Sequence, residues 1–301
     1  MASDSSPIHI GLIGGSGLGD ALGSEQGEAV VIDTPFGQPS SPIVKTKWHG
    51  VDVSILQRHG PGHVIPPSQI PFRANIYALK SLGVTHIVAS GATGSLREHI
   101  KPGDVVIADQ IIDKTCKRAN TFYEKAAVHV EFAEPFCPVM RRWLLAAALR
   151  LRTENPAMTF HDKGTYICME GPAFSTKAES HMHRSWGGDL IGMTAMPEAK
   201  LAREAELAYA LIALPTDYDC WRPHDPHTAP MDLLTEIIGN LKKATNAGIE
   251  LIKASLADVS MLQAQASPAH DALKLAIWSD KKRIDPTEVV RLGVLWKRHF
   301  S

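Results

Sequence analysis

Short apolar runs that end in polar or glycine-rich turns recur along most of the chain. Residues 8–13 run into a glycine turn, and residues 51–57 run into Arg58-His59. Alternation of such runs with stretches of helical repeat is typical of α/β proteins. The pattern therefore predicts strands separated by helices. Further predicted strands cover residues 29–33, 86–90, 104–112 and 164–169.

The stretch from Asp189 to Trp221 is expected to form the centre of a ligand site. Two apolar runs, residues 189–193 and 207–215, flank a short segment with helical character. Two runs around one helix predict a βαβ unit, and ligands of parallel sheets gather at the carboxyl ends of strands. We therefore expect Met193-Thr194 and residues 216–219 to lie on the same rim.

Helical repeats and capping residues predict the main helices. Residues 72–82, 139–152 and 231–256 carry apolar side chains at helical spacing. Thr176 and Glu179 have the spacing of a capping box, in which each side chain bonds the other residue's backbone amide. Asp285-Pro286 marks a further helix start near the C-terminus.

No repeat, low-complexity tract or linker divides the chain. We therefore expect an α/β fold with one domain over residues 8–256, whose central mixed, largely parallel β-sheet is flanked by helices. Residues 1–7 are expected to form a flexible tail, and residues 257–301 a small C-terminal helical extension.

Composition narrows the classes of partner and compartment. Of 301 residues, 44% are hydrophobic and 21% are charged, which suits a soluble globular protein. The formal net charge of -1 gives no reason to expect a nucleic acid or a membrane surface as partner. Signal-peptide and membrane-span patterns are missing, and the four cysteines form no Cys-x-x-Cys pair. We expect a cytoplasmic protein.

Four turns after predicted strands offer donors for an anion. They supply backbone amides, hydroxyls, one guanidinium and one imidazole, a mixture that suits an oxyanion such as phosphate. Arg58, taken alone, is more often a surface ion-pair residue, and His59 more often a packed or solvated one. Their place between a buried-looking strand and a glycine-proline loop favours a binding role. The turns are Gly14-Gly15-Ser16-Gly17, Arg58-His59, the segment 91–95 and Met193-Thr194.

Asp217 and Asp219 flank Tyr218 at the end of an apolar run. A turn that requires short polar residues explains them equally well on local grounds. On an extended segment, side chains two residues apart point the same way, so both carboxyls could face a base that bears N–H groups. Burial against a purine would raise the pKa of such a carboxyl and let it share a proton with a ring nitrogen.

Metal and dinucleotide sites are disfavoured. His181 and His183 lie two apart on a predicted helix, so they face different directions, and we expect no metal site. The turn after residue 13 does not fit Gly-x-Gly-x-x-Gly, which argues against a dinucleotide-dependent oxidoreductase.

Eight short motifs follow one another along most of residues 8–255. They are Ile13-Gly14-Gly15-Ser16-Gly17-Leu18, Thr34-Pro35-Phe36-Gly37, Arg58-His59-Gly60, Gly94-Ser95-Leu96-Arg97-Glu98, Phe132-Ala133-Glu134-Pro135-Phe136-Cys137-Pro138, Glu170-Gly171-Pro172, Met193-Thr194 and Thr216-Asp217-Tyr218-Asp219-Cys220-Trp221. In this order, the motifs resemble those of the 5′-methylthioadenosine phosphorylases of the trimeric purine nucleoside phosphorylase family. The last motif is similar to the 6-aminopurine branch.

The resemblance implies a role for each matching residue. Asp217 and Asp219 would be catalytic, and a homotrimer would place His129 at the pocket of a neighbouring subunit. Phosphate would contact Ser16, Arg58, His59, Gly91, Ala92 and Thr194. The nucleoside would contact Phe174, Ser175, Met193, Asp217, Tyr218, Asp219 and Met231.

The activity implied is a pentosyl transfer: phosphorolysis of S-methyl-5′-thioadenosine to adenine and 5-methylthioribose 1-phosphate, in purine and methionine salvage. Phosphate would be a co-substrate, and no cofactor is expected. A methylthioinosine or general purine nucleoside phosphorylase is the alternative within this class. A nucleotide-binding sensor without catalysis is the alternative outside it.

Overall fold

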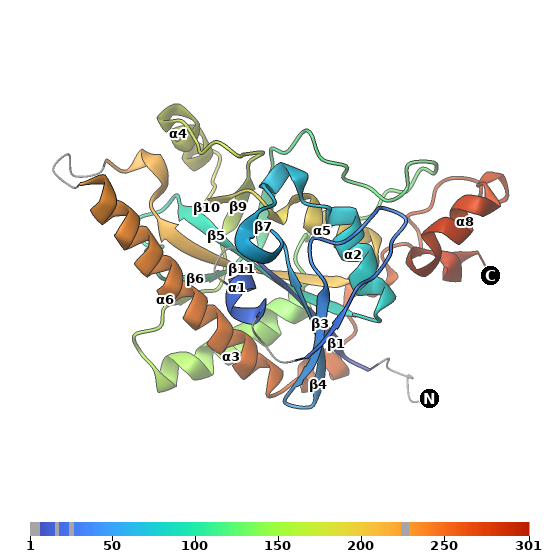
Figure 1. Cartoon of the computed structure of the whole chain (residues 1–301), viewed down its shortest axis with the longest axis horizontal. Coiled ribbons are helices and arrows are strands. Elements are labelled where there is room, and N and C mark those ends of the chain that lie inside the picture. The colour runs from blue at the N-terminus through green and yellow to red at the C-terminus, as the bar shows by residue number, and fades with distance from the viewer. Residues whose placement is uncertain (1–6, 16–17, 24–26, 224–228, 301) are drawn as a thin grey trace.

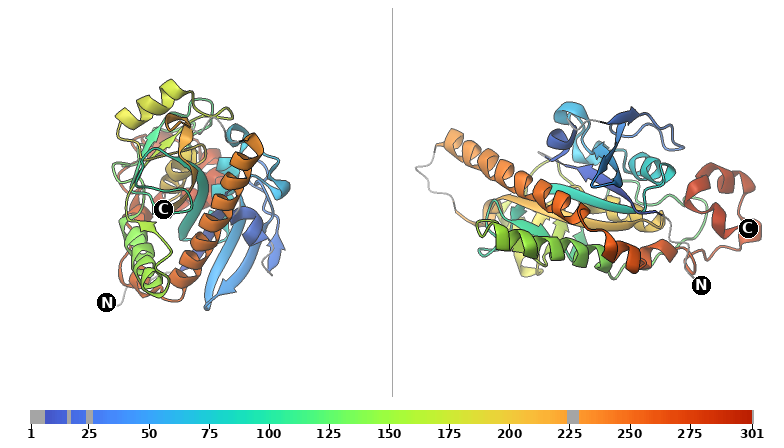
Figure 2. Two further views of the ribbon diagram at one scale, coloured as in Figure 1. Left: turned by 90° about the vertical axis from the view of Figure 1, so that its left-hand side faces the viewer. Right: turned by 90° about the horizontal axis from the view of Figure 1, so that it is seen from below.

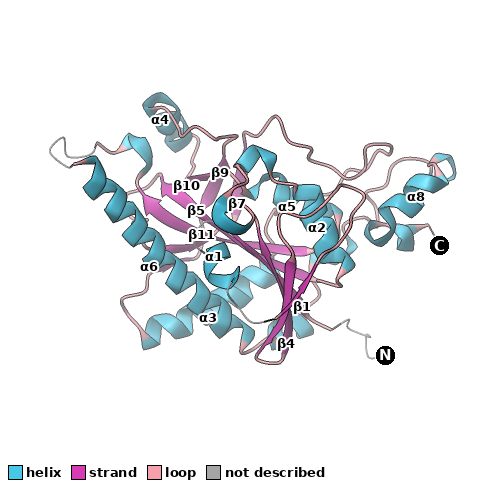
Figure 3. Ribbon diagram, viewed as in Figure 1, coloured by secondary structure: helices cyan, strands magenta, loops and turns pink. Residues whose placement is uncertain are grey.

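The computed structural model describes residues 7–15, 18–23, 27–223 and 229–300. In these residues a mixed sheet is covered by helices on both faces (Figure 1; Figure 3 separates helices from strands). The strands are β1 (His9–Gly14), β2 (Glu28–Val30), β3 (Ile43–Trp48), β4 (Val51–Gln57), β5 (His86–Ser95), β6 (Val105–Ile107), β7 (Gln110–Asp113), β8 (Phe160–His161), β9 (Thr165–Cys168), β10 (Leu190–Gly192) and β11 (Ala208–Asp217). The helices are α1 (Leu18–Gly23), α2 (Phe72–Ser81), α3 (Pro138–Glu154), α4 (Lys177–Ser185), α5 (Ala195–Glu204), α6 (Pro230–Leu256), α7 (Ser260–Ala264) and α8 (Pro286–Leu292).

Strand β5 is the centre of the sheet. The main path runs β2-β3-β4-β1-β5-β10-β9-β7, and β11 pairs with both β5 and β6. Strands β1 and β11 both run parallel to β5. Nearly every residue of β5 and β11 is buried, as expected for central strands covered on both faces. The predicted mixed, largely parallel α/β sheet is confirmed.

Two large apolar clusters, one on each face of the sheet, form most of the core. One includes residues of α2 and α5, and the other includes residues of α3 and α6. Figure 2 shows α3 and α6 lying side by side along their face of the sheet. Trp296, near the C-terminal end of the sequence, is buried in the first cluster, beside Tyr123. The segment that carries α8 therefore packs onto the body, at the end of the molecule away from α4 (Figure 1).

The βαβ prediction for residues 189–217 was wrong in its strand pairing. Strand β11 runs parallel to β5, but β10 runs antiparallel to it, so β10 and β11 are not parallel neighbours. Strand β5 also continues through the predicted turn at residues 91–95. Because β10 runs antiparallel along β5 from Ser95, the residues after it lead back toward Gly91, where Thr194 lies, and not toward Gly94, beside which β11 ends.

Two other strand predictions need correction. The predicted strand 104–112 is two strands, β6 and β7, because the chain leaves β11 at Ala108 and joins β9 from Gln110. The strand predicted at 29–33 is reduced to β2, and its partner β3 was not predicted. In β3 the exposed Lys45 and Lys47 alternate with the less exposed Val44, Thr46 and Trp48, so its period-two pattern was available.

The predicted helices and their caps are confirmed. Thr176 and Glu179 form a capping box at the start of α4. Asp285 caps α8, whose first residue is Pro286. The helix predicted at 231–256 is α6. In the described part of the chain, no helix is both long and apolar enough to cross a membrane.

Candidate functional site

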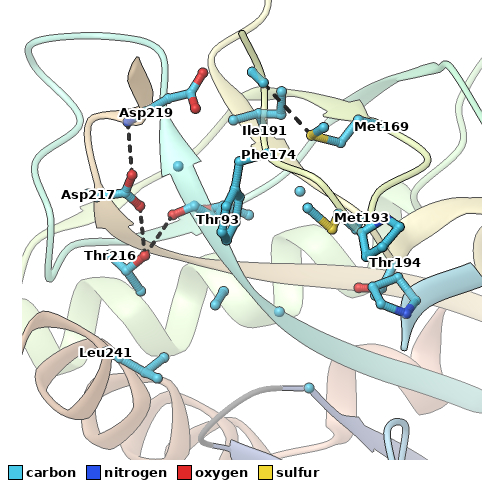
Figure 4. A pocket seen from close by; sticks show the side chains of 18 of the residues that line it. Thr93, Met169, Phe174, Ile191, Met193, Thr194, Thr216, Asp217, Asp219 and Leu241 are labelled. Carbon is cyan, nitrogen blue, oxygen red and sulfur yellow. Dashed lines mark hydrogen bonds between the residues drawn. The ribbon is translucent and has the colours of Figure 1, made fainter. Parts of the chain in front are cut away.

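A cavity of about 520 Å³ opens where β5, β10 and β11 meet the N-terminal half of α6. Most of the predicted site residues lie in its wall. Figure 4 shows Asp217 and Asp219 at one end of the cavity and Thr194 at the other. The lining residues are Gly15, Arg58, His59, His63, Pro67, Gly91, Ala92, Thr93, Gly94, Met169, Pro172, Phe174, Ser175, Ile191, Gly192, Met193, Thr194, Thr216, Asp217, Asp219, Cys220, Ile237 and Leu241.

Arg58 forms a fully buried ion pair with Glu198, a residue of α5 that was not predicted to belong to the site. Its Nε and Nη2 atoms donate to the two carboxylate oxygens at 2.7 and 2.8 Å, and neither side chain is exposed. Tyr209 donates to the same carboxylate at 2.8 Å. Burial alone would lower the pKa of Arg58, but the charge and hydrogen bonds of Glu198 raise it. Arg58 is therefore a fixed cation.

The remaining nitrogen of Arg58, Nη1, is directed toward the glycine segments of β1 and β5. It donates to the carbonyl of Ser90 at 2.6 Å. A Cβ atom on Gly15 would lie 2.7 Å from this nitrogen, and one on Gly91 would lie 4.0 Å from it. Only glycine at position 15 permits this approach, so bare backbone, the guanidinium and the cavity wall meet here. Ser16, the predicted hydroxyl donor of this turn, lies outside the described residues.

His59 follows Arg58 and is also buried. Its Nδ1 lies 2.8 Å from the carbonyl oxygen of Ile65, which can only accept, so Nδ1 carries a proton. Burial lowers the pKa of His59 to about 4, against the opposing effect of the Ile65 hydrogen bond. The ring stacks on His63 at 4.1 Å between centroids. Near neutral pH the imidazole is therefore uncharged.

Thr194 lies on the wall opposite Gly91. A Cβ atom on Gly91 would be 3.5 Å from the Thr194 hydroxyl oxygen. Thr194 precedes α5 but its side chain makes no cap hydrogen bond to that helix. A hydroxyl, a fixed cation, a neutral imidazole and the backbone at Gly91-Ala92 therefore converge, as predicted for an anion site.

At the other end of the cavity, the two aspartates are held as hydrogen-bond acceptors. Thr216 donates to one oxygen of Asp217 at 2.9 Å, and the backbone amide of Asp219 donates to the other at 3.1 Å. Ser180 of α4, which was not predicted, donates to Asp219 at 2.5 Å. Both aspartates thus have carboxylate oxygens in contact with donors.

The expected extended spacing of these aspartates was wrong. The register of β11 shifts between Pro215 and Asp217, and Asp219 has a φ of 48° and begins a 3₁₀ turn, Asp219–Trp221. A bulge re-aims the side chains that follow it, so both aspartates reach the cavity although they are not on one extended face. Tyr218 does not line it; its hydroxyl lies 3.4 Å from the carbonyl oxygen of Glu98.

A loop between β9 and α4 closes the side of the cavity next to the aspartates. Ser175 is held by a 3.2 Å hydrogen bond from Cys220 to its carbonyl. Phe174 lines the cavity but is 85% exposed, so its ring is available to a planar ligand. Met193 and Ile191 provide an apolar wall between the two polar ends (Figure 4).

Besides Tyr218, two further predicted residues, Met231 and His129, lie away from the cavity of a single chain. Met231 stands at the start of α6 and is 68% exposed. His129 packs its ring against the exposed Trp278, 5.0 Å between centroids. In the part of the chain that the structure describes, no three histidine, cysteine or acidic side chains form a group that could hold a metal ion.

The arrangement suits one class of ligand. Donors and a fixed cation at one end can bind an oxyanion, and carboxylates at the other end can accept from N–H groups of a heterocycle. An apolar wall lies between them, and the exposed ring of Phe174 lies on the loop next to the carboxylates. A phosphate and a purine could therefore be held at the two ends of the same cavity.

Comparison with known proteins places the chain among enzymes. Residues 9–257 match the Phosphorylase superfamily. The S-methyl-5'-thioadenosine phosphorylase of Synechocystis sp. is 46% identical over 298 residues, covering 97% of this chain and 87% of the relative. The protein of the same name from Geobacter sulfurreducens is 45% identical, covering 95% of this chain and 97% of the relative.

Solved structures agree in fold. A methylthioadenosine phosphorylase from an antarctic soil metagenomic library has a TM-score of 0.86 and 44% identity, covering 96% of this chain and 99% of that one. A mutant of adenosine/methylthioadenosine phosphorylase from Schistosoma mansoni, in complex with methylthioadenosine, has a TM-score of 0.78 and 35% identity. That alignment covers 90% of this chain and 99% of the other.

Proposed function

Because the chain belongs to the Phosphorylase superfamily, we propose that it transfers the pentosyl group of S-methyl-5′-thioadenosine to phosphate. The products are adenine and 5-methylthioribose 1-phosphate. One observation carries the proposal: an anion-binding end and a carboxylate-lined end share one cavity. Relatives at about 45% identity over almost the whole chain bear the name of this activity.

Phosphate occupies the end of the cavity at Arg58, His59 and Thr194. The Gly91-Ala92 backbone completes the contacts that the described residues offer. Arg58 is neutralised in part by Glu198, so its main effect is a fixed donor at Nη1 rather than a free positive charge. Binding there places a phosphate oxygen beside the anomeric carbon, and such positioning removes much of the barrier of a bimolecular reaction.

Adenine occupies the other end, against Phe174 and Ser175. As the bond from the anomeric carbon to N9 breaks, its electron pair moves into the purine, and the new bond forms from that carbon to phosphate. Asp217, in its acid form, donates its proton to N7 as the electron pair reaches the purine, which then leaves as neutral adenine. The proton of the bound hydrogen phosphate, released once the sugar phosphate has formed, restores the acid. Asp219, held by Ser180, accepts from the 6-amino group. Met193 contacts the ribose, and phosphate is a co-substrate, so the reaction needs no cofactor.

The active form is a homotrimer in which His129 reaches the cavity of the adjacent subunit. The support is an exposed apolar surface around His129, where Leu275 and Trp278 are both more than two-thirds exposed. Met231 on α6 would then face the 5′ substituent near this junction. Sedimentation at assay concentration should give three chains per particle, and a fully active monomer contradicts the proposal.

The decisive assay follows adenine release from methylthioadenosine with and without phosphate. Release should require phosphate and yield the sugar phosphate in equal amount. Equal cleavage of methylthioinosine would favour the general purine nucleoside alternative, since that substrate carries a 6-oxo acceptor. Binding of both ligands without release would favour a nucleotide sensor.

A further inference from the structure

Arg118 lies behind the cavity wall, in the long aperiodic segment that follows β7. The proposed reaction assigns Arg118 no part. Its side chain is 2% exposed, so the guanidinium is removed from water. A buried guanidinium is retained only where several acceptors surround it.

The acceptors of Arg118 come from two separate segments of the wall. Nη1 donates to the carbonyls of Met193 and Met196, each at 2.6 Å. Nη2 donates to the carbonyl of Glu170 at 2.6 Å, and Nε donates to the Glu170 carboxylate at 3.0 Å. One planar group therefore joins the segment 193–196 to the segment that begins at Glu170.

The segment around Arg118 is itself anchored by Glu170. The backbone amides of Cys116 and Lys117 donate to the Glu170 carboxylate at 2.7 and 3.2 Å. Burial would raise the pKa of Glu170, but these hydrogen bonds and Arg118 lower it, so the carboxylate stays ionised near neutral pH. Arg118 and Glu170 thus form a single charged crosslink.

The two joined segments meet at the surface that faces the ligand. A Cβ atom on Gly171 would lie 2.5 Å from the sulfur of Met193, so these residues are in direct contact. Thr194 lies between the two carbonyls that Arg118 holds. The position of the Thr194 hydroxyl against Gly91 therefore depends on this crosslink.

We propose that Arg118 is a positioning residue. It holds Met193 and Thr194 in the places that they occupy when phosphate attacks the anomeric carbon. The inference rests on the proposed function of the cavity. The base end has its own anchors, because Cys220 holds Ser175 and Ser180 holds Asp219. Loss of Arg118 should therefore impair the phosphate end and spare the adenine end.

The test compares Arg118→Met and Arg118→Lys with wild type, as assembled enzyme. Arg118→Met should raise the phosphate KM and lower kcat, each by about tenfold or more, because small displacements of reacting groups reduce rates strongly. The dissociation constant of adenine, measured by calorimetry without phosphate, should change less than about twofold. Arg118→Lys should recover part of the loss, since an ammonium donates but lacks the planar fork.

Arg141→Met is the matched control. The Arg141 guanidinium also binds two backbone carbonyls, those of Ala108 and Asp162, but it lies outside the cavity wall. It should lower stability without changing either kinetic constant of the folded enzyme.

Two results would overturn the inference. Unchanged kinetic constants in folded Arg118→Met would show that the crosslink is only structural. Equal weakening of adenine binding and phosphate binding would show that the whole cavity is disrupted. The wild-type enzyme tests the proposed function separately. If it releases no adenine from methylthioadenosine, the proposed function is wrong, whatever the Arg118 variants do.

Discussion

The two ends of the cavity are built in opposite ways. At the phosphate end, Arg58 and Glu198 are completely buried, and Tyr209 and the Ser90 carbonyl occupy further hydrogen-bonding positions. At the adenine end, Phe174 is largely exposed, and two hydroxyls and a backbone amide donate hydrogen bonds to the aspartates.

The difference follows from what each ligand needs. An anion loses its hydration on binding, so its donors must already be fixed and dry to compensate. A purine has a large apolar surface and N–H groups, so its own burial on binding can cover apolar side chains that are exposed before it binds. Substitutions at the phosphate end should therefore reduce both activity and stability. Substitutions at the adenine end should reduce activity with little change in stability.

Glu198→Ala is expected to have the largest effect. It leaves the buried guanidinium of Arg58 without its ion-pair partner and Tyr209 without an acceptor. Removing one member of a buried pair destabilises a protein by about 3–5 kcal/mol. Urea denaturation should show a loss of this size, together with loss of phosphate-dependent adenine release.

Glu28→Ala is the control for the same type of pair at the surface. Glu28 lies 3.5 Å from Lys45, and both side chains are well exposed. Its loss should change the free energy of unfolding by less than about 1 kcal/mol. Similar losses in the two variants would mean that the phosphate end is not specially preorganised.

Asp217→Asn should separate activity from stability at the adenine end. The amide has the same shape, but it cannot share a proton with N7, so kcat/KM for methylthioadenosine should fall by about 10²–10⁴. Because an amide N–H can donate to a 6-oxo group, the preference over methylthioinosine should also narrow. Steady-state assays with both nucleosides measure these changes.

Asp271→Asn, an exposed aspartate of the C-terminal segment, is the control and should leave both rates unchanged. If Asp217→Asn kept the wild-type rate with both substrates, Asp217 would have no role at the base.

The buried state of His59 predicts a pH dependence at the phosphate end. Burial lowers its pKa from 6.5 to about 4, so between these values the unfolded chain binds more protons than the folded one. This contribution to stability is complete above pH 6.5 and is lost as the pH falls toward 4. The slope of the unfolding free energy against pH is proportional to the number of protons taken up on unfolding. His59→Gln should reduce that number by up to about one in this pH range.

Urea denaturation of both proteins between pH 4.5 and 7 measures that difference in slope. Burial raises the pKa of Glu204 to about 7, which acts with the opposite sign, but it does so in both proteins and cancels. Equal slopes would show that His59 is charged or solvated in the folded protein.

The sequence predicted the residues whose positions depend only on their neighbours along the chain. Arg58 and His59 follow a strand, and Thr176 and Glu179 share one helical turn, so neighbours along the chain place them. The glycine at position 15 was likewise predicted to bring bare backbone to an anion. Each of these features needs only the strand or helix in which it occurs.

The residues that complete the site were missed because their partners are distant in sequence. Arg58 meets Glu198 across 140 residues, and Met193 meets Arg118 across 75. Ser180 reaches Asp219 across 39 residues, from a helix predicted only by its cap. The sequence did place an acidic residue, Glu198, on a helix face that is buried, which could have indicated a buried ion pair. Nothing in the sequence indicated that β10 pairs antiparallel.

Phe174→Ala should have the smallest effect on stability and still be visible in binding. The ring is 85% exposed, so its removal should change the free energy of unfolding by less than about 0.5 kcal/mol. An aromatic contact with adenine contributes about 0.5–1.5 kcal/mol, so the KM for methylthioadenosine should rise about two- to tenfold. The phosphate KM should stay within about twofold, since Phe174 lies at the other end of the cavity. Leu149→Ala, similarly exposed on α3, should change neither constant. A large loss of stability, or an unchanged nucleoside KM, would mean that the loop is packed on the protein rather than completed by the base.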